Sequence, residues 1–274
     1  MARNNTGAAL LLASQHSRCQ RLLFGAVLLA GVLGSALGHA GELIVYSTNI
    51  APFFYSNEEN ALSAVRGEGA GAVNELLNLA ARETDVTLDI RALPFRRLTA
   101  LLNTRPQTLA VMWRLPEVEN TRVWLAKLLS EQLVVLLRSD SVLNPKDLTS
   151  LRNMHIGVVL GGPAEVAVRR LGLTDIETAS TAESNARKLA IGRIDAWVAF
   201  RSVADVTQRQ IGSSMKAVRV GAVLQNMDLY LTCGSIKDER EVSQWKSTFM
   251  RLRKEGLQQS LLQRYDLALG PDTR

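Results

Sequence analysis

Cysteine and histidine are scarce in this chain of 274 residues, which contains 2 cysteines and 3 histidines. Cys19, His16 and His39 fall in an N-terminal segment that has the pattern of a removable leader, which would leave one cysteine and one histidine. Cys233 then has no intrachain disulfide partner, and in its apolar stretch it is most simply a small buried side chain. His155 alone cannot supply most histidine-based metal or acid–base chemistry, so we expect neither a metal nor a cofactor.

Sequence motifs of catalysis and of nucleic-acid binding are also missing. The chain has no Gly-x-Ser-x-Gly, no zinc motif and no phosphate-binding loop. Arg251, Arg253 and Lys254 cluster, but on a stretch with helical periodicity, where a solvated helix face is the simpler explanation. We therefore expect no enzymatic activity and no nucleic-acid partner.

The first forty residues resemble a secretory leader. Arg18 and Arg21 precede an uncharged apolar run at residues 22–37, and small residues Gly38 and Ala40 follow. We expect residues 1–40 to be a signal peptide cleaved after Ala40, which places the mature chain in the periplasm. An uncleaved membrane anchor is the alternative, although the apolar run is short for a full span. Removal of the three leader arginines lowers the formal net charge from +6 to +3.

After residue 42, strand and helix patterns alternate, which indicates an α/β protein with parallel strands. A polar loop is expected at 56–71, a helical or irregular stretch at 116–127, and a helix start at 144–148. Apolar periodicity predicts further elements. The predicted strands are 43–48, 86–93, 109–113, 132–137, 156–160, 176–179, 196–200, 217–223 and 229–233. The predicted helices are 73–82, 94–103, 164–171, 181–192, 201–210 and a tail at 239–269 that breaks at Gly256.

Five short segments, in this order, carry a resemblance to the type II periplasmic solute-binding proteins, the family that includes the polar amino-acid binders. They are Ala51-Pro52-Phe53-Phe54, Gly71-Ala72-Val73-Asn74-Glu75-Leu76-Leu77, Arg114-Leu115-Pro116-Glu117-Val118-Glu119, Ile191-Gly192-Arg193-Ile194-Asp195-Ala196 and Leu252-Arg253-Lys254-Glu255-Gly256 with Leu262 and Tyr265. The resemblance spans about residues 42–269. It rests on the shared order and spacing of these segments, none of which is specific by itself.

The resemblance implies a two-lobed, type II periplasmic-binding-protein-like α/β fold with a central cleft and two interlobe crossings. The crossings would lie near 129–131 and 225–227. Lobe 1 would then comprise 41–130 plus 228–274, and lobe 2 would comprise 131–227. Ligands in such proteins lie where loops leave the carboxyl ends of the strands, and binding closes the lobes like a hinge.

Three positions depart from the family's amino-acid clamp. The resemblance aligns the family's carboxylate-binding arginine with Val118 and its ammonium-binding acid with Phe200. The turn that holds the carboxylate is Gly161-Gly162-Pro163-Ala164 here, without a hydroxyl and with one amide fewer. An amino-acid zwitterion left unpaired in a closed cleft would cost several kcal/mol. We therefore expect that the chain does not bind ordinary α-amino acids in the family's way.

The candidate ligand-binding residues combine aromatic and polar side chains with a glycine turn. Phe53, Trp113 and Phe200 could line an aromatic pocket, or they could be ordinary core residues. Arg114 could meet an anionic ligand, or it could pair with Glu117 or Glu119. The full set of candidates is Asn49, Phe53, Tyr55, Trp113, Arg114, Gly161, Gly162, Phe200 and Arg201.

Three functions remain open from the sequence. The first is a monomeric extracytoplasmic solute-binding protein that captures a small molecule and passes it to an inner-membrane permease of an ABC-type transporter. The second is a periplasmic sensing or accessory module for a membrane sensor. The third is an enzyme of the same fold, for which Glu117, Glu119 and Asp195 are the available acids.

Overall fold

The computed structural model describes residues 42–55, 70–84, 86–143, 149–236 and 238–270. The expected signal peptide and the expected helix start at 144–148 lie outside these residues, as does most of the expected loop at 56–71. Within the described part, no helix has both the length and the apolar character required to cross a bilayer.

The described strands form one sheet in the order β2-β1-β3-β8-β4-β7-β5-β6. β1 lies parallel to β2 and β3, and β5 lies parallel to β6 and β7. The strands are β1 (Glu42–Ser47), β2 (Thr87–Ala92), β3 (Leu109–Trp113), β4 (Val123–Arg138), β5 (Ile156–Val159), β6 (Ile176–Ala179), β7 (Ala196–Phe200) and β8 (Val218–Cys233).

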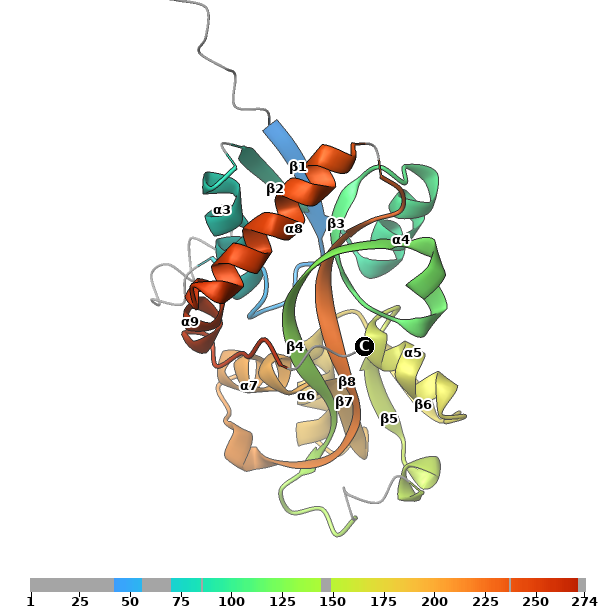
Figure 1. Ribbon diagram of the computed structural model, residues 1–274. Helices are drawn as coiled ribbons and strands as arrows, with labels where there is room; N and C mark the ends of the chain where they lie inside the picture. Colours follow the sequence, from blue (N-terminus) through green and yellow to red (C-terminus); the bar gives the residue numbers. More distant parts are fainter. Residues whose placement is uncertain (1–41, 56–69, 85, 144–148, 237, 271–274) are drawn as a thin grey trace, which may run out of the picture. The chain divides into compact units, whose positions relative to one another are not determined.

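Two long antiparallel strands, β4 and β8, join the two lobes of the fold (Figure 1). β3 pairs with the end of β8 at Leu229–Thr232, whereas β7 pairs with the second half of β4. The chain therefore crosses between the lobes twice, inside continuous strands. The prediction of two separate strands at 217–223 and 229–233 was wrong, because the polar stretch between them pairs with β4 and continues the ladder. The prediction for 116–127 was also wrong in its second half: a 3-10 helix, η1 (Pro116–Thr121), is followed by β4.

The first lobe has helices on both faces of its sheet. Buried leucines of α3 (Ala72–Arg82) share one core with α8 (Glu239–Lys254) and α9 (Leu257–Gln263). On the other face, Leu98 and Leu102 of α4 (Phe95–Thr104) pack against Ala110 and Met112 of β3. All five residues of β3 are buried because helices cover both faces of this strand.

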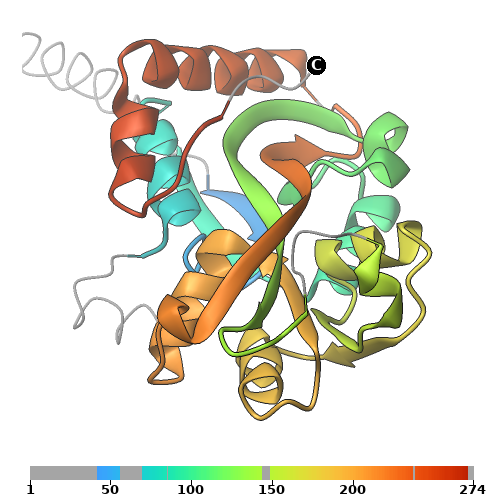
Figure 2. The ribbon, with the colours of Figure 1, turned by 90° about the horizontal axis from the view of Figure 1, so that it is seen from below.

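The second lobe repeats this layering. Ala167 and Val168 of α5 (Pro163–Arg170) pack in the same core as Val158 of β5. α6 (Ala182–Ala190) and α7 (Arg201–Gln210) cover the opposite face, where their buried side chains surround Trp197 of β7. In Figure 2, the long strands β4 and β8 lie between α7 and α5. Short 3-10 helices, η2 (Ser150–Asn153) and η3 (Met215–Ala217), precede β5 and β8.

A buried ion pair joins the two crossing strands, with Lys127 on β4 and Asp228 on β8. The Lys127 Nζ lies 3.1 Å from the Asp228 Oδ1, and the two side chains are 2% and 4% exposed. The Ser130 hydroxyl donates to Asp228 and lies within hydrogen-bonding distance of the Leu269 carbonyl oxygen, and the Ser130 N–H donates to the Ala268 carbonyl. The end of the described chain is therefore fastened to the point at which the lobes meet.

Candidate functional site

A cavity of about 490 Å³ lies between residues of the two lobes. Its walls come from the loops that leave the carboxyl ends of β1, β2, β5, β6 and β7. This is the edge at which open α/β sheets bind ligands, because connections that leave the carboxyl ends of neighbouring strands in different directions open a crevice there.

The first lobe contributes three short segments to the cavity. Residues 48–51 follow β1, residues 92–95 end β2 and begin α4, and Trp113 ends β3. Asn49, one of the predicted ligand-binding residues, is therefore part of the wall. Pro94 fixes the start of α4, where it serves as the N-cap residue.

The second lobe contributes the turn after β5, the start of α6 and one side of α7. Gly162, Pro163 and Ala164 line the cavity from the start of α5. Residues 180–183 line it from the start of α6, where the Thr181 hydroxyl caps the helix by accepting from the Ser184 N–H at 3.2 Å. The α6 contribution and the α7 wall were not among the residues predicted from the sequence. The helix itself was predicted at 181–192, with Thr181 at its start, but its first residues were not expected to line the ligand site.

Phe53, Trp113 and Phe200 form a cluster that joins the lobes. The rings of Trp113 and Phe200 are stacked with centroids 3.9 Å apart, and Phe53 lies edge-on to both at 5.5 and 6.4 Å. All three side chains are no more than 6% exposed. The predicted aromatic residues thus lie together. Trp113 and Phe200 also line the cavity, so the cluster is at once interlobe packing and cavity wall.

The turn at Gly161 and Gly162 has little capacity left to bind an anion. The Gly161 N–H donates to the Glu165 Oε2 at 2.6 Å, and the Gly162 N–H donates to the Val159 carbonyl at 3.1 Å. Pro163 has no N–H to offer. Of the two predicted glycines, Gly162 lines the cavity, whereas a Cβ on Gly161 would meet the Arg96 side chain at 2.9 Å.

Glu165 is held as a carboxylate beside this turn. Burial would raise its pKa, but the hydrogen bond from Gly161 and the cations Arg169 and Arg96 leave the pKa below its usual range. The Arg169 Nε donates to the Glu165 Oε1 at 2.9 Å. The Glu165 carboxylate therefore stabilises the glycine turn, and Arg96 of the first lobe lies close enough to interact with it electrostatically.

Arg114 pairs with a neighbouring acid. Its Nε donates to the Glu119 Oε2 at 2.8 Å and a second bond joins the same pair, while Trp124 and Tyr230 flank the guanidinium. The pKa of Glu119 is lowered by this contact. Arg114 does not line the cavity, and its geometry matches the ion-pair alternative that the sequence left open.

Tyr55 and Arg201 line a different hollow of about 750 Å³. Acids and bases from α3, β4, α7 and the C-terminal segment surround this hollow, and Glu131 accepts from the Ser202 N–H at 3.2 Å to cap α7. The hollow does not include the aromatic cluster. The structure thus separates these two predicted residues from Asn49, Trp113, Gly162 and Phe200.

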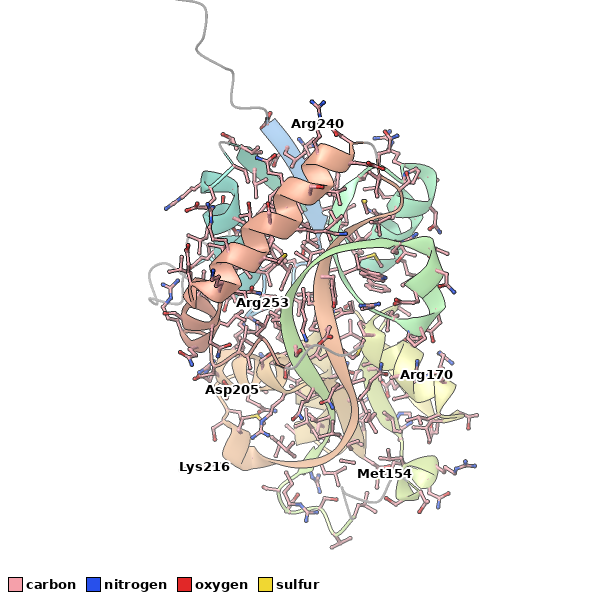
Figure 3. All side chains as sticks on the ribbon, viewed as in Figure 1. Met154, Arg170, Asp205, Lys216, Arg240 and Arg253 are labelled. Atoms are coloured by element: carbon pink, nitrogen blue, oxygen red, sulfur yellow. The ribbon has the colours of Figure 1, made fainter. Side chains whose placement is uncertain are left out.

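The other candidate acids have structural partners. The Asp195 Oδ2 accepts from the His155 N–H at 2.8 Å, and the His155 ring lies between Asp175 and Glu177 at 2.6 and 2.8 Å. Glu117 lies 3.5 Å from Arg170, which Figure 3 labels at α5. Among the described residues, no group of three or more histidines, cysteines and acids is placed to hold a metal ion.

The fold and the position of the cavity define the type II periplasmic-binding-protein architecture. No family model and no curated protein matches the chain. Solved structures share the fold. A mutant of ArgBP from T. maritima has a TM-score of 0.68 and 20% identity, over 82% of this chain and 95% of that chain.

Other matching structures come from proteins of different kinds. A histidine kinase sensor domain with similarity to periplasmic binding proteins has a TM-score of 0.72 and 15% identity, over 84% of this chain and 98% of that chain. The ancestral amino-acid-binding protein AncCDT-1, described as a precursor of cyclohexadienyl dehydratase, has a TM-score of 0.66 and 18% identity, over 82% of this chain and 95% of that chain. At these identities the comparisons show the fold alone.

Proposed function

We propose that the protein binds a small molecule between its two lobes and acts outside the cytoplasm as a solute-binding protein. The observation that carries this proposal is the 490 Å³ cavity, whose walls come from both lobes at the carboxyl ends of five strands. A ligand in such a place contacts both lobes at once, so its binding energy favours their closed arrangement. In this proposal, lobe 1 is 41–130 plus 228–274 and lobe 2 is 131–227.

The ligand of this proposal is not an ordinary α-amino acid. Val118 packs partly buried against the core, Phe200 stacks on Trp113, and the glycine-turn amides already have acceptors. A zwitterion would lose its hydration without gaining charged partners, at a cost of several kcal/mol. The structures of amino-acid-binding proteins therefore suggest the kind of site but not its occupant.

Delivery to an inner-membrane ABC-type permease is the role that we favour. A signal peptide at residues 1–40 and periplasmic location belong to this proposal, as does a monomeric state. The sensing role is the second candidate, and it is favoured by the similarity to a histidine kinase sensor domain. An enzyme is less well supported, because the three acids considered from the sequence are engaged by Arg114, Arg170 and the His155 backbone.

A thermal-shift screen of a broad metabolite library on the full chain tests the binding function. A true ligand binds the folded state only, so the melting temperature rises with ligand concentration. At a hundredfold excess over Kd the free energy of unfolding increases by about 2.7 kcal/mol. Two variants of one helix locate the site. Ala182→Trp adds a large side chain to the cavity wall at the start of α6, whereas Ala190→Trp adds it at the exposed end of the same helix.

The hit should shift the melting temperature of the wild type and of Ala190→Trp but not of Ala182→Trp. A library without any hit, or a hit that still stabilises Ala182→Trp, would contradict a ligand site in this cavity.

A further inference from the structure

The cavity extends along one face of a helix. Val203, Thr207 and Gln210 of α7 all line it. These residues are spaced by four and three positions, so they lie on the same face of the helix. Seven residues of α-helix correspond to ~10 Å. The cavity is therefore long enough for a ligand body that extends well beyond the aromatic cluster.

The wall that faces this space is largely apolar. Ala182 of α6 and Ala199 of β7 line the cavity together with Val203, and the Thr207 side chain is buried. Small side chains on these elements leave room that larger residues would have filled. An apolar ligand body would gain free energy here in proportion to the surface that it removes from water.

Glu183 is the one charged residue among the described residues that line the cavity. Its side chain is half-buried, and no hydrogen bond or ion pair joins its carboxylate to another described residue. Arg96 approaches Gly161 but is not part of the lining, and it faces Glu165. The lining thus offers an unpartnered negative charge and no described positive charge.

Building on the proposed binding function, we propose that the cavity takes an elongated apolar molecule with one cationic end. The apolar body lies along Val203 and Thr207 of α7, and the ammonium group pairs with the Glu183 carboxylate. An anionic end would be brought next to Glu183 without a partner, which is unfavourable through both desolvation and repulsion.

Calorimetric titration of the full chain with straight-chain amines, alcohols and carboxylates tests this proposal. The probes are the series from butylamine to octylamine with the corresponding alcohols and alkanoates, kept below their micelle concentrations. Affinity for the amines should rise about fourfold per added methylene group while the chain lies within the apolar wall. The amine should bind about tenfold more tightly than the alcohol of equal length, and the alkanoate should bind most weakly.

Two variants test whether the negative charge of Glu183, rather than a change in the fold, determines amine binding. Glu183→Gln should reduce amine affinity about tenfold to the level of the alcohol and leave alcohol binding unchanged. Glu239→Gln is the matched control, since Glu239 is also a first-turn acid but begins α8 outside the cavity. It should leave both affinities unchanged.

The outcomes distinguish this proposal from the binding function on which it rests. Alkanoates that bind as tightly as amines, or an amine preference that survives in Glu183→Gln, would overturn the ligand class. The absence of binding by every probe would also overturn it. In each case a library hit that Ala182→Trp abolishes would still support a ligand site in the cavity, and the absence of such a hit would remove both proposals.

Discussion

At the scale of single residues, the buried ion pair Lys127–Asp228 is the electrostatic contact on which we expect the stability of the fold to depend most. Both side chains are almost fully buried, and Ser130 adds a hydrogen bond to the carboxylate. We predict that Asp228→Asn destabilises the protein by about 3–5 kcal/mol, because a buried ammonium would lose its counter-charge. Chemical denaturation of the variant measures this loss.

The matched control is an exposed pair. Asp205 of α7, labelled in Figure 3, lies 3.0 Å from Arg209, with 42% and 60% exposed side chains. Asp205→Asn should change stability by less than about 1 kcal/mol. Equal losses in the two variants would show that the burial of the Lys127 pair has no special energetic weight.

His155 makes stability depend on pH. Hydrogen bonds to Glu177 and Asp175 raise the pKa of the His155 imidazole, so folding favours its protonated form. The resulting stability is fully present below the unfolded pKa of ~6.5 and is lost as pH rises through the higher folded pKa. Between pH 6 and 9 the melting temperature of the wild type should fall more than that of His155→Gln, by about 2 °C. Parallel melting curves across this range would contradict the assignment.

The acid partner of His155 gives the opposite dependence. Lys188, and then His155, lower the pKa of Glu177 to about 2. Its stabilising contribution is therefore present above the unfolded carboxyl pKa and is lost as pH falls towards 2. The two groups together favour the neutral to mildly acidic range.

At the scale of elements, Gly71 fixes how α3 starts against the loop that carries Phe53. Gly71 has φ +96°, and a Cβ there would lie 2.6 Å from the Phe53 carbonyl oxygen. We predict that Gly71→Ala destabilises the protein by more than ~2 kcal/mol, since backbone strain and a steric clash with the backbone add.

Gly212 provides the matched control in denaturation experiments. It also has positive φ, at +74°, but nothing lies within 4 Å of its Cβ position. Gly212→Ala should cost only the backbone strain of about 1 kcal/mol. If the two variants lose equal stability, the close approach to Phe53 is not what requires glycine at position 71.

The sequence predicted short, continuous apolar strands best. The bounds expected for β3, β6 and β7 agree with the structure, because each is a compact run whose ends are marked by turn residues. The long strands were harder. Gln225 and Asn226 interrupt the apolar pattern of β8, and the pairing with β4 that keeps the strand continuous is a long-range contact. The tail also stops being helical at Gln263, before the predicted end at 269.

Part of the candidate site could be predicted from the sequence. The order of strands placed Asn49, Trp113, Gly162 and Phe200 at one edge of the sheet, and all four line the cavity. The direction in which individual side chains point could not be predicted from the sequence. Arg114 pairs with an acid five residues away, and the α7 wall depends on how that helix packs beside α6.

At the scale of the whole molecule, the aromatic cluster couples the two lobes. Trp113 of the first lobe stacks on Phe200 of the second, and both are buried. We predict that Phe200→Ala lets the lobes separate in the absence of ligand and costs about 3–5 kcal/mol in stability. Small-angle scattering should then show a larger radius of gyration for the variant than for the wild type.

Phe249→Ala is the control for this prediction. Phe249 stacks on Trp245 within α8, so its truncation removes a similar ring without touching the contact between the lobes. It should lower stability and leave the radius of gyration unchanged. A Phe200→Ala variant with the wild-type radius would show that the cluster does not hold the lobes together.

The most direct test of the account is calorimetric titration of a screened ligand into the wild type, Ala182→Trp and Ala190→Trp. We predict one binding site per chain in the wild type and in Ala190→Trp, and at least tenfold weaker binding in Ala182→Trp, whose new ring occupies the cavity wall. Undiminished affinity in a folded Ala182→Trp protein would contradict the claim that the ligand lies between the lobes.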